Sequence, residues 1–323
     1  MTSVSRRVWF ERAIPTEFED EVGPSIEAVG PGTPSDPFAG IDSAAGVIAS
    51  VLTYDGVVMD RAKRALAIVR TGIGFDRVDI EAATARGIAV CNTPDAPTVS
   101  TAEHAMALLL AVTKEVAASA NRLRAGEPDL YSRHRAIELE GKILGLVGFG
   151  RIARRVAIAA RALGMEVVAF DPFLDWDNVG VARMETLEDL LRAADVVSIH
   201  VPLTGDTRHL FDDRRLKAMK RGAFLINTSR GSVVDQTSLI AALDNGHLRG
   251  AALDVTDPEP LPPEHPLLNR SDVVITPHVA SATAEGKRRI FRSALAQVTA
   301  VLEGQKPPHL VNHEVWPPAR SPA

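Results

Sequence analysis

Along most of its 323 residues, the chain alternates short apolar runs rich in β-branched residues with longer segments that repeat apolar residues three and four apart. This alternation constrains the fold more than any other feature, because it is typical of βαβ units whose parallel sheet is covered by helices. We therefore predict an α/β protein. The length exceeds one ordinary hydrophobic core and favours two domains.

The clearest part of the pattern lies between Gly141 and Thr276. Helical patterns separate six predicted strands there, which indicates one doubly wound domain. The predicted strands are Ile143–Val147, Val167–Phe170, Val196–Ile199, Phe224–Ile226, Ala251–Leu253 and Val273–Thr276. The predicted helices between them are Ile152–Leu163, Leu187–Ala194, Asp213–Met219 and Thr237–Asn245.

A weaker series of strands precedes this domain and predicts a second, smaller α/β unit. Its elements are the strands Val8–Phe10, Val47–Ala49, Ala67–Val69 and Ile88–Val90 and the helix Ile80–Arg86. Two prolines within Cys91–Pro97 favour a boundary or hinge, since proline biases its neighbours away from helix. We expect a long helix from Val99 to about Leu123 and another from Glu285 to Leu302.

Composition excludes several classes of protein. No charge-free stretch reaches the roughly 18 apolar residues of a membrane span, and charges from Glu11 onward interrupt any secretory signal, so we expect a cytoplasmic protein without a membrane partner. A net charge of −5, with basic and acidic residues interleaved, gives no reason to expect a nucleic-acid partner. Cys91 is the only cysteine, and His309 and His313 follow two prolines, so no metal site is expected.

A glycine-rich segment, Gly145–Ala153, follows the strongest predicted strand and contains G-x-G-x-x-A. Gly148 can make the tight turn, and Gly150 can let a pyrophosphate approach the amides at the start of the next helix. Asp171, at the end of the next strand, is placed for an adenosine ribose. Because no Lys or Arg follows it before Arg183, we predict NAD rather than NADP. The motif alone leaves a flavin or a plain structural turn open.

Three polar residues follow the later strands, at the edge where doubly wound sheets bind ligands. Arg230 can hold carboxylate and carbonyl oxygens with its planar guanidinium. His278 can donate a proton to a carbonyl oxygen, and Glu259 can hold the imidazole in its acidic form. Together they suit reversible hydride transfer at a 2-oxo acid, whereas His104 and His200 are interpreted as structural.

Four long motifs carry a resemblance to a known family. They are Leu144–Ala153, Asp195–Thr207, Met219–Asp235 and the segment Gly250–Pro260 that leads to Pro277-His278. With these motifs the chain resembles the D-isomer-specific 2-hydroxyacid dehydrogenases over nearly its whole length. The resemblance implies an NAD-dependent oxidoreductase.

The resemblance also implies roles for individual residues. In the family, the arginine, glutamate and histidine that match Arg230, Glu259 and His278 are catalytic. The cofactor-binding positions would be Thr101, Gly148, Gly150, Arg151, Ile152, Asp171, Val201, Pro202, Thr207, Thr228 and Asp254. The substrate would be held by Arg230 and by the amides of Gly72, Ile73 and Gly74, since consecutive amides of a glycine turn bind anions.

The family's architecture implies a discontinuous domain map. A Rossmann-type domain, residues 95–284, would be inserted into a flavodoxin-like substrate domain formed by residues 1–94 and 285–323, with hinges near Asp95 and Ala284. A homodimer would form through about Val99–Glu140. Many members have Asn where this chain has Pro97 and Trp where it has Tyr131, which bears on the hinge and the dimer arm.

The substrate is less sharply predicted than the reaction. Formate-oxidising members carry Gln at the Glu259 position. Phosphoglycerate-oxidising members carry an Arg-Ser pair near Ser50–Thr53, and many add a regulatory domain for which 323 residues leave no room. Glyoxylate or hydroxypyruvate reduction is therefore favoured over phosphoglycerate oxidation. The other alternative is a dinucleotide-gated binding protein, like the corepressors that share this fold.

Overall fold

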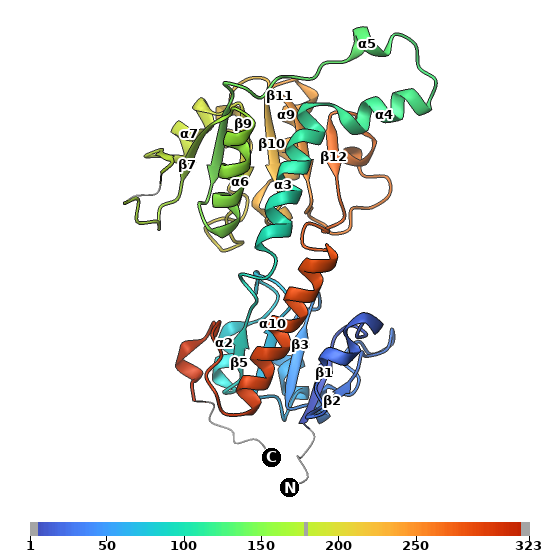
Figure 1. The fold of residues 1–323 in the computed structure, drawn as a ribbon, viewed down its shortest axis with the longest axis vertical. Coiled ribbons are helices and arrows are strands. Elements are labelled where there is room, and N and C mark those ends of the chain that lie inside the picture. The colour runs from blue at the N-terminus through green and yellow to red at the C-terminus, as the bar shows by residue number, and fades with distance from the viewer. Residues whose placement is uncertain (1–5, 178–179, 318–323) are drawn as a thin grey trace. The chain divides into compact units, whose positions relative to one another are not determined.

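The computed structural model describes residues 6–177 and 180–317. The chain divides into two units, one formed by Met1–Pro97 with Ala284–Ala323 and the other by Thr98–Thr283. Each unit is built on one parallel sheet with helices on both faces (Figure 1).

The sheet of the first unit has five strands in the order β2-β1-β3-β4-β5, all parallel. This is the flavodoxin-like order, in which the chain changes direction along the sheet between β1 and β3. The strands are β1 Arg6–Phe10, β2 Ile26–Val29, β3 Gly46–Ala49, β4 Ala67–Arg70 and β5 Ala89–Cys91. The helices are α1 Gly56–Arg61, α2 Ile80–Ala85 and α10 Ala284–Leu302, with 3-10 turns at Thr16–Glu21 (η1), Ile41–Ser43 (η2) and His313–Val315 (η5).

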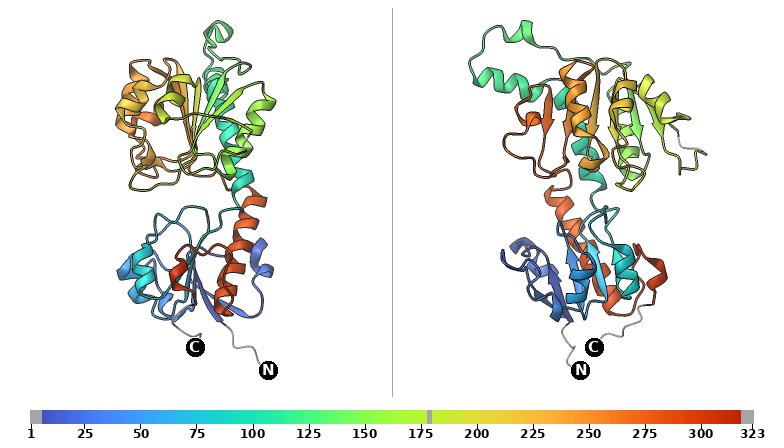
Figure 2. Two further views of the ribbon diagram at one scale, coloured as in Figure 1. Left: turned by 90° about the vertical axis from the view of Figure 1, so that its left-hand side faces the viewer. Right: turned by 180° about the vertical axis from the view of Figure 1, so that it is seen from behind.

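Alternating side chains of this sheet fill two separate cores. Val8 and Phe10 pack on one face with Phe291 and Val298 of α10. Trp9, between them, packs on the other face with the residues of α1 and α2. This alternation is the two-residue period of a strand with both faces buried, and Figure 2 shows α10 and the α1–α2 pair on opposite faces.

The sheet of the second unit has seven parallel strands in the order β12-β11-β10-β9-β6-β7-β8. This is the Rossmann order with one strand added, so the predictions of a doubly wound domain and of a smaller flavodoxin-like sheet are confirmed. The strands are β6 Ile143–Val147, β7 Glu166–Phe170, β8 Ala182–Arg183, β9 Val196–Ile199, β10 Ala223–Asn227, β11 Leu248–Leu253 and β12 Val273–Ile275.

Two layers of helices bury this sheet. One core joins it to α3 and α6, and the other joins it to α7, α8 and α9. The helices are α3 Thr98–Thr113, α4 Val116–Arg124, α5 Leu130–Arg133, α6 Arg151–Ala162, α7 Leu187–Ala193, α8 Asp213–Ala218 and α9 Gln236–Asp244, with 3-10 turns at Gly231–Val233 (η3) and Pro266–Asn269 (η4). Within the described residues, no helix is both long and apolar enough to cross a membrane.

The single long helix expected from Val99 to about Leu123 is wrong. The structure has α3 and α4 with a break between them, where Glu115 takes a left-handed backbone with φ 50°. The apolar face of α3 ends at Val112, and α4 buries no side chain. Because α4 has no apolar face to bury, extending α3 as one straight helix would add no packing energy. Arg122 stabilises the break through an ion pair of 2.9 Å with Glu115.

Two strands were not predicted. β2 is an edge strand of the first sheet and alternates little in burial, and β8 pairs only two exposed residues with β7. The predicted count of six strands in the larger sheet is therefore corrected to seven. Edge strands of this kind carry too short an apolar signal to be recognised in a sequence.

Candidate active site

His278 and Glu259 form a hydrogen-bonded pair beyond the carboxyl ends of β12 and β11. Nδ1 of His278 lies 2.6 Å from Oε1 of Glu259, and 45% and 31% of the two side chains are exposed. An ionised carboxylate can only accept hydrogen bonds, so Nδ1 carries a proton in this pair. Nε2 is then the ring atom that can exchange a proton with a bound molecule.

The turn that carries His278 is shaped by a buried carboxylate. His278 has a left-handed backbone with φ 53°, which costs a side-chain-bearing residue about 1–2 kcal/mol. Its amide donates to the carbonyl of Asp254 at 2.8 Å. The fully buried carboxylate of Asp254 accepts hydrogen bonds from Thr276 Oγ1 at 2.6 Å and from the amides of Val279 and Ala280 at 2.9 Å each. Asp254 therefore holds the backbone on both sides of the histidine.

Two further histidines have partners that fit the structural interpretation. Nε2 of His104 lies 2.9 Å from Thr276 Oγ1 and 3.3 Å from Oδ1 of Asp254, so it extends the same network. His200 directly follows β9, with Nε2 2.9 Å from Ser198 Oγ. Burial lowers the pKa of His200 to about 4, so its ring is neutral at neutral pH.

Arg230 lies in the loop after β10, next to the Asp254–Glu259 loop. The side-chain amide of Asn227 donates to the carbonyl of Arg230 at 2.9 Å, and Nη1 of Arg230 donates to the carbonyl of Ser229 at 2.8 Å. At Gly231 an added Cβ would collide with the backbone of Thr256. Glycine is thus required for this close approach. Arg230, Glu259 and His278 consequently follow three adjacent strands at one edge of the sheet.

The glycine-rich turn between β6 and α6 provides an open helix N-terminus. Gly148 has φ 84°, and an added Cβ would lie 2.9 Å from the carbonyl oxygen of His200, so only glycine fits. Gly150 precedes the first residue of α6, and an added Cβ there would meet nothing within 4 Å. No side chain caps this helix, and its first turn contains Arg151 but no acidic residue. An anionic phosphate can therefore approach the amides at this helix N-terminus.

Asp171 connects this turn to β7. Its carboxylate accepts hydrogen bonds from the amides of Phe149 at 2.9 Å and Phe173 at 3.0 Å. Each carboxylate oxygen has a second lone pair, so the predicted ribose contact is compatible with this arrangement. The sequence did not reveal that Trp176 donates to the Asp171 carbonyl at 3.2 Å or that Arg183 stacks on the Trp176 ring at 5.9 Å.

The larger unit matches a family model described as the NAD-binding domain of D-isomer specific 2-hydroxyacid dehydrogenases. The match covers residues 106–280, which is more than half of the chain. The chain belongs to this family of 2-hydroxyacid dehydrogenases. Membership confirms the resemblance based on the motifs, and with it the predictions of an NAD-linked oxidoreductase that interconverts hydroxy acids and oxo acids.

Individual relatives of this 2-hydroxyacid dehydrogenase agree with the assignment. It is similar to a glyoxylate reductase from Thermofilum pendens, with 43% identity over 267 residues, 81% of this chain and 79% of the relative. It is 38% identical over 258 residues to a D-3-phosphoglycerate dehydrogenase from Methanocaldococcus jannaschii, covering 79% of this chain but only 49% of that protein. The solved structure of the TT0316 protein from Thermus thermophilus has 42% identity and a TM-score of 0.86, covering 94% of this chain and 99% of that one.

The residues expected to bind NAD are distributed along one edge of the larger sheet. The segment after β6 contains Gly148, Gly150, Arg151 and Ile152, and the loop after β9 contains Val201, Pro202 and Thr207. One residue follows each of three other strands: Asp171 after β7, Thr228 after β10 and Asp254 after β11. Thr101 lies on α3. Parallel strands end at the same edge, so all but Thr101 lie at that edge, Arg151 and Ile152 in the first turn of α6 and the others in loops.

Two observations show that these residues fit a dinucleotide. The hydroxyl of Thr228 is buried and has no hydrogen-bond partner, as expected of a group that binds a ligand. The open backbone at Gly150 leaves room for a pyrophosphate. Thr207, by contrast, already donates to the carbonyl of Pro202 at 2.6 Å and accepts from the amide of Thr204 at 2.7 Å, so its hydroxyl shapes its own turn. The individual NAD contacts stay predictions.

The predicted substrate-binding residues Gly72, Ile73 and Gly74 form a loop after β4 in the other unit. Its three carbonyls accept hydrogen bonds from the amide of Thr93 at 2.9 Å, Asn92 Nδ2 at 2.7 Å and Arg70 Nε at 3.1 Å. With the carbonyls held, the loop has a fixed backbone whose amides can face an anion. We refer to Gly72–Gly74 below as the glycine loop.

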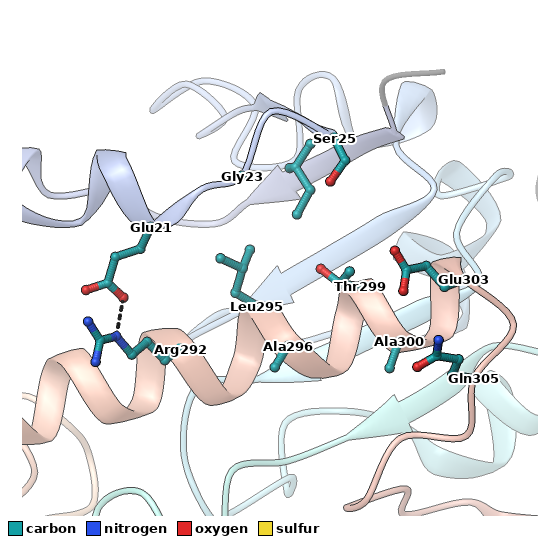
Figure 3. Close-up of a pocket in the computed structure, with 11 residues that line it drawn as sticks. Glu21, Gly23, Ser25, Arg292, Leu295, Ala296, Thr299, Ala300, Glu303 and Gln305 are labelled. Carbon is teal, nitrogen blue, oxygen red and sulfur yellow. Dashed lines mark hydrogen bonds and ion pairs between the residues drawn. The ribbon is translucent and has the colours of Figure 1, made fainter. Parts of the chain in front are cut away.

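A groove of about 520 Å³ in the smaller unit is not part of this site. It lies between α10 and the η1–β2 segment, with Glu21 and Arg292 paired at one end at 2.8 Å (Figure 3). None of the predicted catalytic, cofactor or substrate residues lines it. In the part of the chain that the structure describes, no group of three or more His, Cys, Asp or Glu could hold a metal ion.

Proposed function

We propose that the chain reduces a small, unphosphorylated 2-oxo acid with NADH to the D-2-hydroxy acid, with glyoxylate and hydroxypyruvate as the first candidates. The observation that carries the proposal is the His278–Glu259 pair, 2.6 Å apart, at the sheet edge that also presents Arg230. The similarity to a glyoxylate reductase over 79% of that protein supports the choice of substrate.

Each of the three side chains has one task in this proposal. Bound NADH supplies the hydride. Arg230 holds the carboxylate and carbonyl oxygens of the substrate and withdraws electron density from the carbonyl. His278 donates its Nε2 proton to the oxygen that becomes the hydroxyl, and Glu259 stabilises the imidazolium through Nδ1. The reverse reaction uses neutral His278 as the base.

The glycine loop is proposed to bind the substrate carboxylate through its amides. The family resemblance and the three hydrogen-bonded carbonyls support this role. The proposed domain map follows from it: residues 1–94 and 285–323 would form the substrate domain and residues 95–284 the NAD domain. The division of the chain at Pro97 and Ala284 supports that map.

The proposed assembly is a homodimer formed through the segment after α3. Helices α4 and α5 bury no side chain, and this arm projects from the rest of its unit (Figure 1). Leu123 and Tyr131 on it are 67% and 96% exposed. Light scattering on a Leu123→Asp, Tyr131→Asp double variant should give the monomer mass, whereas the unchanged chain should give twice that mass.

We also propose a cytoplasmic location. The support for it is that the sequence contains a single cysteine, the buried Cys91, and so no disulfide within the chain.

An NADH and NADPH oxidation screen tests the proposed reaction. The substrates are glyoxylate, hydroxypyruvate, pyruvate, longer 2-oxo acids and 3-phosphohydroxypyruvate. We expect turnover with NADH on the first two, and loss of turnover without loss of NADH binding in His278→Ala. The matched control is His265→Ala, because His265 lies in a different loop and only caps η4.

Two outcomes would redirect the proposal. A clear preference for 3-phosphohydroxypyruvate would favour D-3-phosphoglycerate dehydrogenase activity. NADH-dependent capture of a partner protein without turnover of any 2-oxo acid would favour a corepressor-like binding protein. Near-normal turnover of His278→Ala would refute the proposed mechanism.

A further inference from the structure

A buried carboxylate occupies the carboxyl edge of the smaller sheet. Glu11 directly follows β1 and is 9% exposed. It accepts hydrogen bonds from the amides of Ser50 and Val51 at 2.5 Å each and of Leu52 at 2.9 Å. A fourth hydrogen bond, of 2.9 Å, comes from the phenol of Tyr54. We refer to Ser50–Leu52 as the nest loop.

The arrangement is an anion-binding nest that the chain fills with its own side chain. Successive backbone amides that converge on one point are a common way to bind phosphate or another anion. The nest loop follows β3, and β1 and β3 are the strands between which the chain direction reverses. Ligands of doubly wound sheets bind at such a switch point. Here Glu11 supplies the negative charge at that place.

The fourth donor is also locked in its donating form. Tyr54 is completely buried. Burial, reinforced by the neighbouring Glu11 carboxylate, holds the pKa of the Tyr54 phenol far above its usual value. The phenol therefore stays protonated and continues to donate to Glu11 across the accessible pH range.

The nest loop begins beside the glycine loop. β3 pairs with β4 up to Ala49, and both the amide and the hydroxyl of Thr71 donate to the Ala49 carbonyl at 2.9 Å. Val51, Ile73 and the adjoining Phe75 are large exposed hydrophobic residues there, with Arg77 exposed beside them and Arg70 buried on β4. An anionic group on a molecule bound there would find the three amides of the nest loop already occupied by the Glu11 carboxylate.

We infer that Glu11 is a positioning and specificity-determining residue: its carboxylate fixes the nest loop and excludes a second anionic group, above all a phosphate, from the substrate's far end. The inference rests on the proposed function, in which the glycine loop holds the substrate carboxylate. It assigns to this chain a preference for 2-oxo acids whose side chains carry no charge.

Hydrogen exchange of the whole chain tests the positioning role without requiring any turnover. In Glu11→Ala, peptides that contain the nest loop should exchange at least about tenfold faster, since three charge-assisted hydrogen bonds are lost. Inorganic phosphate should restore protection in this variant and have no effect on the unchanged chain. Glu17→Ala is the matched control, because Glu17 is an exposed glutamate on η1.

Steady-state kinetics test the specificity role. Glu11→Gln removes the charge and keeps an acceptor oxygen on only one side of the nest. The ratio of kcat/KM for glyoxylate to that for 3-phosphohydroxypyruvate should fall at least about tenfold in this variant, mainly through KM for the phosphorylated acid. NADH affinity should be unchanged. Tyr54→Phe, which leaves the carboxylate in place, should keep the ratio of the unchanged chain.

The two measurements separate this inference from the proposed function. If the unchanged chain turns over no 2-oxo acid, the proposed function fails, while nest-loop exchange still tests the role of Glu11. Unchanged exchange in Glu11→Ala, or failure of phosphate to restore protection, overturns the positioning role. An unchanged selectivity ratio in Glu11→Gln overturns the specificity role.

Discussion

Replacing Asp254 by asparagine tests whether a buried carboxylate sets the position of His278. Oδ1 of Asp254 accepts the hydroxyl of Thr276 at 2.6 Å and the amide of Val279 at 2.9 Å, while Oδ2 accepts the amide of Ala280 at 2.9 Å. Asparagine keeps only one of these two acceptor oxygens, because its other side-chain atom is an NH₂ donor. If it faces Thr276 and Val279, the side-chain NH₂ opposes the amide of Ala280, donor against donor.

The expected magnitudes follow from these contacts. Losing a hydrogen bond to a charged group costs about 1.5–3 kcal/mol, and a buried donor without a partner costs about 1–3 kcal/mol. We expect the free energy of unfolding of Asp254→Asn to fall by about 3 kcal/mol. The left-handed backbone of His278 costs about 1–2 kcal/mol, which the Asp254 carboxylate offsets. Without that carboxylate the turn can relax and move His278 out of position, and the same ~1–2 kcal/mol should then lower kcat/KM by about 5- to 30-fold.

Urea unfolding and steady-state kinetics on glyoxylate measure the two effects. The control is Asp213→Asn, which removes a carboxylate from an exposed ion pair with Lys217 on α8 and should change neither value measurably. Equal stability of Asp254→Asn and the unchanged chain would refute the hydrogen-bond argument. A loss of stability with unchanged kcat/KM would refute the coupling between Asp254 and His278.

Three further predictions concern the larger unit. Gly148→Ala should weaken NADH binding at least about tenfold by fluorescence titration, since φ is 84° and the new Cβ would lie 2.9 Å from the carbonyl of His200. Glu259→Gln should lower the reductive kcat/KM about 100-fold with NADH affinity unchanged, because the imidazolium of His278 loses its counter-charge; an equal loss of NADH affinity would contradict this. His200 has a pKa lowered from 6.5 to about 4 by burial, so an unfolded chain protonates it first: the stability from its neutral form is full above pH 6.5 and is lost as the pH falls toward 4. Urea unfolding at both ends of this pH range should show that the free energy of unfolding falls by at most about 3 kcal/mol. In His200→Asn this pH-dependent loss should be absent.

The architecture of both units could be predicted because their strands are buried on both faces. Runs such as Val196–Ile199 are continuous apolar segments, and the amphipathic helices between them specify which connections cross the sheet. The strands that were not predicted lack this burial. β2 and β8 are edge strands, and the break at Glu115 depends on where an apolar face ends rather than on a helix-breaking residue.

The candidate site was predictable to the extent that it lies directly after strands. Arg230, Glu259 and His278 each follow a strand end, so a correct strand assignment brings them to one edge before any distance is known. What the sequence could not reveal are contacts made across the sheet. Glu11 holds amides about 40 positions away, and nothing in its local surroundings marks it as different from Glu17.

Among the residues that the structure describes, the same arrangement occurs three times, in each case between neighbouring strands. Glu11 after β1 holds the nest loop after β3, Asp171 after β7 holds the glycine-rich turn after β6, and Asp254 after β11 holds the His278 turn after β12. Each loop must present backbone or side-chain groups to a ligand and cannot fold back on a hydrophobic core, so a carboxylate that accepts its amides fixes it instead. An acidic residue after a strand therefore has two interpretations, as a ligand contact or as a clamp on the adjacent loop. Neutralising a clamp must increase amide exchange in that loop even in the absence of ligand, whereas neutralising a residue that only contacts ligand must not.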